Sequence, residues 1–213
     1  VDIGPQGYGE PSDELDYASD RTAAWVVEHV VLPSDVTANA GTGGSIAIGP
    51  DDQPAIASWY NERVATGSAD WNQLWYLKRN SNGAWNKTVV ATAPDNYAAG
   101  DGPKGTGFAP YLRFDDQGRP HILFEDQASE HFRFQDEFAG QIRHTFWNGS
   151  NWVFNTVYRQ SLPTTQQVIY PAFALSGNEF TYIGLSRESV WNEWVWPRTC
   201  VSTYQYVSGT RNF

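Results

Sequence analysis

The sequence predicts an all-β protein made of repeated four-stranded antiparallel units. Short apolar runs alternate with polar residues at a period of two, and Gly, Asn, Asp and Pro separate the runs. One pattern also recurs without gaps at a long spacing, which is the mark of a repeat architecture. Its copies are Ile46-x-Ile48-(x7)-Ile56, Leu112-x-Phe114-(x7)-Ile122 and Phe173-x-Leu175-(x7)-Ile183.

Each copy of this pattern reads as a hairpin of two strands, A and B, around a polar turn. The turns are Gly49-Pro-Asp-Asp-Gln-Pro54, Asp115-Asp-Gln-Gly-Arg-Pro120 and Ser176-Gly-Asn-Glu179. Aspartate suits such turns because its side chain hydrogen-bonds to the backbone nearby. The matched Asp51-Asp52 and Asp115-Asp116 pairs therefore indicate turns and not a calcium site.

A second hairpin, of strands C and D, belongs to each unit and carries a Trp at the start of strand D. Its copies run from Leu15-Asp-Tyr17 to Trp25, from Leu74-Trp-Tyr76 to Trp85 and from Ile142-Arg-His144 to Trp152. Asn-Gly steps at Asn82-Gly83 and Asn148-Gly149 favour the positive-φ geometry of tight hairpins. The stretch from Asp20 to Val31 resembles a short helix, but its alignment with the other hairpins predicts a strand.

The chain, residues 1–213, is therefore predicted to be a single repeat domain of β-propeller blades. It divides into a C–D half-blade at 14–31, full blades at 44–92 and 109–158, and a blade or half-blade with a tail at 170–207. A weaker pair of strands is expected from Glu193 to Val207. About three to three and a half blades result, which leave the ring incomplete within one chain.

The C–D turns echo the Asp-box, S/T-x-D-x-G-x-x-W. Thr145, Gly149 and Trp152 keep its spacing, while Trp147 stands in the place of the aspartate. In the first copy Asp20 and Trp25 fit, and the other two positions do not. On these residues the chain resembles the sialidase-like (BNR-type) β-propeller repeat proteins over nearly its whole length. The resemblance implies a propeller fold and leaves activity open, because the Asp-box is structural in that family.

The incomplete ring has two interpretations that concern partners. The chain is a piece of a longer propeller, or another copy completes the ring, because unpaired strand edges invite pairing with a second chain. The first residue is Val and the sequence contains no Met, which indicates a processed or partial chain. An aromatic-rich, thiol-poor composition favours an extracellular or periplasmic location.

Composition excludes several classes of function. With 24 acidic and 14 basic residues the net charge is −10, which argues against a nucleic-acid partner. No apolar run is long enough to span a membrane as a helix. A single cysteine, Cys200, allows no internal disulfide and no cysteine-ligated metal cluster, and no other metal site or cofactor is predicted. The 10 Trp, 11 Tyr and 11 Phe residues suit flat ligands such as sugar rings.

The longest loops, B–C and D–A, are expected to emerge on one face of the blades, and such a face is the default place for a ligand. Aromatic rings there would stack on sugars, arginines would pair with carboxylates, and acidic groups would accept hydrogen bonds from hydroxyls. The predicted ligand-binding residues are Trp59, Tyr60, Glu62, Arg63, Trp71, Arg187, Glu188 and Trp191. If the chain is an enzyme, the predicted catalytic residues are Glu125, Asp126, His131 and Arg133.

Three functions remain open on the sequence. The first is an extracellular propeller that binds carbohydrate or another surface polymer through its loop-rich face. The second is a polysaccharide lyase or a glycoside hydrolase, which needs a pair of carboxylates at a defined separation. The third is a structural subunit that assembles through open blade edges. His121 and His144 align with aromatic or small residues of the other repeats, so both are expected to fill strand positions.

Overall fold

A computed structural model describes residues 15–20, 24–31, 40–62, 71–92, 105–128, 139–159, 166–176, 179–190 and 193–205. All regular structure in these ranges is β-strand, so they include no helix that is long and apolar enough to cross a membrane. The strands are β1 Leu15–Ser19, β2 Val26–Val31, β3 Ala40–Ile48, β4 Pro54–Glu62, β5 Trp71–Arg79, β6 Trp85–Thr92, β7 Gly105–Phe114, β8 Pro120–Ala128, β9 Ala139–Trp147, β10 Trp152–Arg159, β11 Gln166–Ser176, β12 Glu179–Val190 and β13 Glu193–Gln205.

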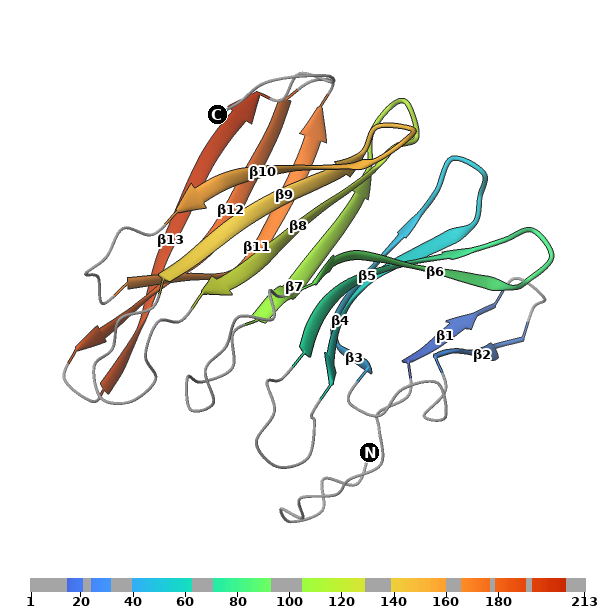
Figure 1. Ribbon diagram of the computed structural model, residues 1–213, viewed down its shortest axis with the longest axis horizontal. Helices are drawn as coiled ribbons and strands as arrows, with labels where there is room; N and C mark the ends of the chain where they lie inside the picture. The colour runs from blue at the N-terminus through green and yellow to red at the C-terminus, as the bar shows by residue number, and fades with distance from the viewer. Residues whose placement is uncertain are drawn as a thin grey trace, which may run out of the picture.

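The strands form four antiparallel sheets in which neighbours in sequence are neighbours in space. The sheet orders are β1-β2, β3-β4-β5-β6, β7-β8-β9-β10 and β11-β12-β13. The sheets follow one another across the molecule from the blue end of the chain to the red end (Figure 1). The predicted all-β fold of four-stranded blades is therefore confirmed. The stretch 14–31, predicted as a half-blade, contains the two-stranded sheet β1-β2.

The last sheet differs from the prediction in one respect. In place of a pair of tail strands, residues Glu193–Gln205 form a single long strand, β13. It pairs with β12 along nearly its whole length, from Val190 opposite Glu193 to Glu179 opposite Gln205. Continuous pairing with β12 satisfies the backbone of this segment without a further turn.

The hydrophobic core lies between successive sheets. Between β1-β2 and the next sheet, Ile56, Tyr60, Trp75 and Leu77 pack with Leu15 and Val30. The interface between the two four-stranded sheets contains Ala55, Ala57, Leu74, Val90, Leu112, Ile122 and Phe124. The next interface contains Leu123, Ile142, Val157 and Phe173. Each central strand thus contributes alternate residues to two interfaces, as the period of two requires.

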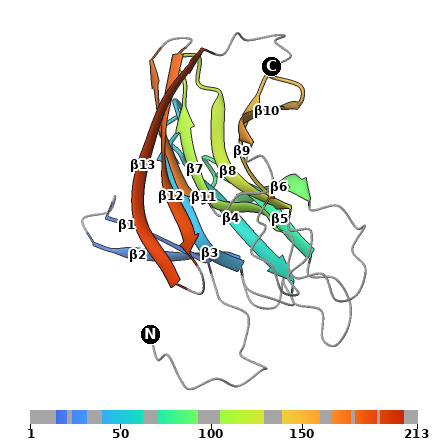
Figure 2. The same ribbon diagram turned by 90° about the vertical axis from the view of Figure 1, so that its left-hand side faces the viewer.

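Two features orient the blades. The first strands of the three larger sheets, β3, β7 and β11, lie next to one another, so each sheet presents its first strand to the same side (Figure 2). The short turns β3–β4, β5–β6, β7–β8 and β9–β10 all lie along one edge, at the upper right of Figure 1. We call this the turn edge. The opposite edge, where β4, β6, β8 and β10 end, is the loop edge.

The turns at the turn edge use positive-φ backbone positions, which the sequence predicted for the Asn-Gly steps of the C–D turns. Asp52 and Gly118 occupy equivalent positions of the two A–B turns and have φ angles of 57° and 76°. Gly83 and Gly149 of the C–D turns have φ angles of 89° and 101°. Asx-type hydrogen bonds support these turns, such as Gln117 N to Asp115 Oδ1 at 3.0 Å.

Candidate functional site

The strands that meet the loop edge extend farther along the chain than the sequence predicted. Glu62 lies opposite Trp71 and Arg187 lies opposite Gln167, so these residues lie on paired strands and not in loops. The strands extend because backbone pairing continues past polar residues once a neighbouring strand is available. The same holds for the other residues that were predicted for loops, namely Trp59, Tyr60, Glu125, Asp126 and Glu188.

Glu125 and Asp126 lie side by side on β8 and face opposite interfaces, because successive strand residues alternate. Glu125 is only 4% exposed and lies opposite Ile142, on the side of β11-β12-β13. Asp126 lies on the side of β3-β4-β5-β6. These two carboxyl groups therefore do not form a pair across one bond, and a hydrolytic pair would combine one of them with a group on another segment.

Asp126 forms an ion pair with Arg143 of β9. Arg143 Nη1 donates to Asp126 Oδ2 at 2.9 Å, and both side chains are mostly shielded from solvent. The guanidinium also lies over the rings of Phe154 and Phe124, at 4.8 and 5.9 Å from their centroids. Contacts with two aromatic rings and a carboxylate hold Arg143 in one orientation.

Thr106 lies next to this ion pair, opposite Asp126 in the register of β7 and β8. The residue is 2% exposed, and its hydroxyl has no hydrogen-bond partner among the described residues. The neighbouring Gly107 has a φ of 89°, and a Cβ there would lie 2.8 Å from Leu74 Cβ. Gly107 thus lets the start of β7 approach β5 closely, which places Thr106 inside the interface.

The aromatic residues predicted for this edge have different environments. Tyr60 is buried and stacks on Trp75, with ring centroids 4.1 Å apart and an interplanar angle of 14°. It serves the first interface as a core residue. Trp59 is half-buried and lies opposite Leu74, whose side chain belongs to the second interface. Trp59, Thr106, Asp126 and Arg143 thus share the loop end of the second interface.

For some predicted site residues the structure gives only the strand on which they lie, and others fall outside the described residues. Glu62 ends β4, Trp71 starts β5, and Arg187 and Glu188 lie on β12. Arg63, His131, Arg133 and Trp191 lie outside the described residues. In the described part of the chain, no three His, Cys, Asp or Glu side chains gather as metal ligands would.

A buried polar cluster lies toward the turn edge of the third interface. Asp115 Oδ2 accepts hydrogen bonds from Arg119 Nε at 2.7 Å and from His121 Nε2 at 3.2 Å. His121 Nδ1 lies 2.9 Å from His144 Nε2. Burial lowers the pKa of His121 to about 4, although Asp115 opposes this shift. A neutral His121 that donates to Asp115 through Nε2 must accept at Nδ1, so His144 donates from Nε2.

This cluster is structural, in line with the alignment of both histidines with aromatic or small residues at strand positions of the other repeats. His121 and His144 are fully buried and stack with Phe146. Burial lowers the pKa of His144 well below its ordinary value, so its imidazole is neutral at physiological pH. Both side chains are enclosed by the sheets and present no surface to a ligand.

Sequence reasoning missed two members of the loop-edge group, Thr106 and Arg143. Arg143 left a signal, since it stands between Ile142 and His144 where the alternation places it on an interface. Thr106 left none, because its burial depends on the close approach of β7 to β5.

Comparisons with known proteins leave the family open. No protein-family model matches the chain, and no curated protein matches it. Among solved structures, it is similar to an alpha-L-arabinanase of Penicillium chrysogenum in complex with arabinobiose, at 10% identity and a TM-score of 0.43 over 74% of this chain. It is also similar to a proposed glycoside hydrolase of Parabacteroides distasonis, at 10% identity and a TM-score of 0.39 over 87% of this chain. The chain spans about half of those structures, 48% and 56% of their lengths.

Proposed function

We propose that the chain binds carbohydrate at the loop edge of its blades. The observation that carries this proposal is the grouping of four side chains at one end of the second interface. Trp59 offers an aromatic ring, Thr106 a buried hydroxyl without a partner among the described residues, and Asp126 with Arg143 a fixed acceptor and donor. Aromatic faces and hydrogen-bonding groups in one place are what a sugar ring requires.

The carbohydrate proposal is tested with a glycan array. The chain should retain one class of glycan, and Trp59→Ala should weaken that binding about tenfold through loss of a ring contact. Asp126→Asn keeps the shape of the side chain and removes its charge, so it should weaken binding in the same direction. Absence of any retained glycan, or unchanged binding by both variants, would contradict the proposal.

Glycoside hydrolysis is the second candidate function, and the burial of Glu125 favours it. A carboxyl group that is shielded from water near the loop edge is the kind of group that serves as a general acid. Release of reducing ends from polysaccharides should then fall by at least about 100-fold in Glu125→Gln, while glycan retention is kept. Equal release by both proteins would assign the activity elsewhere.

A further inference from the structure

The turn edge carries a Tyr–Trp pair that recurs at two successive interfaces. Tyr17 of β1 meets Trp85 of β6 edge to face, with centroids 5.5 Å apart and an interplanar angle of 66°. Tyr76 of β5 meets Trp152 of β10 in the same way, at 5.4 Å and 67°. Each tyrosine thus contacts the tryptophan one blade further along. Because the same geometry recurs at both interfaces, the Tyr–Trp contact is a structural feature of the repeat.

The positions around the two pairs are equivalent by strand register but hold different residues. Glu28 lies opposite Tyr17, and Thr88 lies opposite Tyr76. Likewise Arg79 pairs with Trp85 at the end of its hairpin, as Trp147 pairs with Trp152. One interface therefore carries Glu and Arg where the other carries Thr and Trp.

At the first interface these positions are joined by a two-pronged ion pair. Arg79 Nε and Nη2 donate to the two carboxylate oxygens of Glu28, both at 2.8 Å. The side chains are 20% and 24% exposed, so the pair is largely enclosed. Arg79 Nη1 also donates to Gln53 Oε1 at 3.3 Å, so polar contacts within the protein occupy this position.

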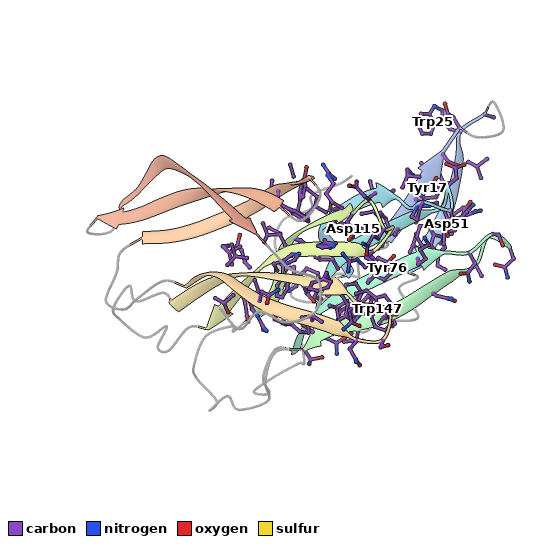
Figure 3. The ribbon with its side chains drawn as sticks, turned by 90° about the horizontal axis from the view of Figure 1, so that it is seen from above. Tyr17, Trp25, Asp51, Tyr76, Asp115 and Trp147 are labelled. Carbon is purple, nitrogen blue, oxygen red and sulfur yellow. The ribbon has the colours of Figure 1, made fainter. Side chains whose placement is uncertain are left out.

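At the second interface the same positions line an open cleft of about 370 Å³, which lies in the size range of small-molecule sites (about 300–1,000 Å³). Its wall includes Asp51, Tyr76, Lys78, Thr88, Trp147 and Trp152. Asp51, Tyr76 and Trp147 lie near one another at this edge, while Trp25 stands well apart (Figure 3). Replacement of an ion pair by Thr88 and Trp147 leaves room for a ligand here.

The chemistry of the cleft combines aromatic rings with matched polar groups. Trp147 and Trp152 lie edge to face, with centroids 5.8 Å apart. Lys78 Nζ donates to Asp51 Oδ1 at 2.7 Å. The hydrogen bond from Lys78 lowers the pKa of Asp51, and burial raises the pKa of Tyr76, so the carboxylate stays ionised and the phenol protonated. Lys78 and Asp51 neutralise each other, and the pair presents both ammonium N–H donors and carboxylate acceptors.

We infer that this cleft is a second carbohydrate site, which holds a neutral sugar unit against Trp147. The charges of Lys78 and Asp51 cancel, so a uronate or sialate carboxylate would find no spare cation among them. A sugar presents a C–H face for a ring and hydroxyls for Asp51, Lys78, Thr88 and Tyr76. Proline-rich peptides also dock on aromatic clefts, but they need fewer polar partners than this wall supplies.

The test uses the 213-residue chain and titrations with xylohexaose, mannohexaose, cellohexaose and maltohexaose, followed by saturation-transfer NMR and calorimetry. A galacturonate hexamer and a proline decapeptide represent the two competing ligand classes. One neutral hexamer should bind, and Trp147→Ala should weaken it at least about tenfold. The polysaccharide built from the same sugar as the bound hexamer is then tested by affinity gel electrophoresis. Retardation of the protein shows that the cleft accepts internal units of a chain and not only free oligosaccharides.

The sister interface supplies a matched variant. Thr88→Glu combined with Trp147→Arg installs the ion pair of the first interface, so it should fill the cleft, keep the fold and abolish binding. Trp25→Ala, at a tryptophan that is 74% exposed, should leave binding unchanged. Trp59→Ala should weaken binding only at the loop edge, so the part of hexamer binding that depends on Trp147 should persist in this variant.

Several outcomes would overturn the second site. They are no binding by any neutral hexamer, undiminished binding by the Thr88→Glu/Trp147→Arg variant, and binding that depends on Trp59 and not on Trp147. Binding of the galacturonate or the proline decapeptide alone would replace the sugar with another ligand class.

Discussion

At the position of His144 the repeat changes its residue type but keeps the same kind of ring-packing contact. His144 occupies the position of Tyr17 and Tyr76 and packs against Phe173 at 6.1 Å and 67°, much as those tyrosines pack against Trp rings. The substitution brings a second nitrogen-bearing ring next to His121. The consequence is a core that contains two imidazoles which must stay neutral.

This neutrality predicts a loss of stability in acid. The folded pKa of His121 is about 4, below the ordinary 6.5, so between these values the unfolded chain binds a proton that the folded chain does not. The free energy of unfolding should therefore fall as the pH drops from about 6.5 to 4, by about 3 kcal/mol for His121 alone. Urea unfolding at several pH values measures it. His121→Gln should flatten the slope, and an equal slope in both proteins would contradict the assignment.

Gly118 occupies a turn position where both the backbone conformation and the surrounding space disfavour a side chain. Its φ is 76°, and a Cβ would lie 2.6 Å from Pro50 Cγ. Gly118→Ala should therefore lower the free energy of unfolding by more than about 1 kcal/mol. Gly149→Ala is the control, since φ is 101° there but nothing lies within 4 Å. Equal losses in thermal or urea unfolding would mean that the contact with Pro50 has no effect.

At the scale of elements, the C–D hairpin is the unit that joins blades. The tyrosine of one hairpin packs on the tryptophan of the next, and the residue paired with that tryptophan lies beside the contact. Arg79 forms an ion pair with Glu28 of β2 at this position, whereas Trp147 lines an open cleft.

The ion pair between β5 and β2 predicts a measurable coupling. A double-mutant cycle with Glu28→Gln and Arg79→Met should give about 1–2 kcal/mol, because the contact is bidentate and largely enclosed. The exposed pair of Asp16 and His29 provides the comparison, with side chains 42% and 56% exposed. Its coupling should stay below about 0.5 kcal/mol. Similar values for both pairs, from urea unfolding, would argue against a role in joining the blades.

Much of this element structure was predictable from the sequence, because the period of two and the gapless repeat specify strands and their pairing order. Strand ends were not predictable. Glu62 and Asp126 are polar, yet they continue strands because the neighbouring strand satisfies their backbone. The turn-edge cleft was also missed, since it depends on which side chains of two different blades meet. In the sequence, Trp147 was noted only because it stands where the Asp-box has its aspartate.

At the scale of the whole molecule, stability comes from the interfaces between stacked sheets. Phe124 is fully buried in the interface that joins the two four-stranded sheets. Phe124→Ala should cost about 3–5 kcal/mol, whereas Val89→Ala, at a residue 46% exposed, should change stability by less than about 0.5 kcal/mol. Tryptophan fluorescence and circular dichroism should report one shared transition. Separate transitions would mean that the sheets unfold independently.

Association remains a proposal at this scale. Ile46 and Ile48 are 49% and 52% exposed, whereas Leu112 at the equivalent position of the next blade is fully buried. A partner strand, from another copy or from a longer chain, would cover Ile46 and Ile48.

The most direct test of carbohydrate binding at the two edges is a glycan array probed with the unchanged chain, Trp59→Ala, Trp147→Ala and the double variant. We predict that the unchanged chain retains glycan, that each single variant retains less, and that the double variant retains none. Retention that is absent from the unchanged chain, or equal in all four proteins, would contradict it.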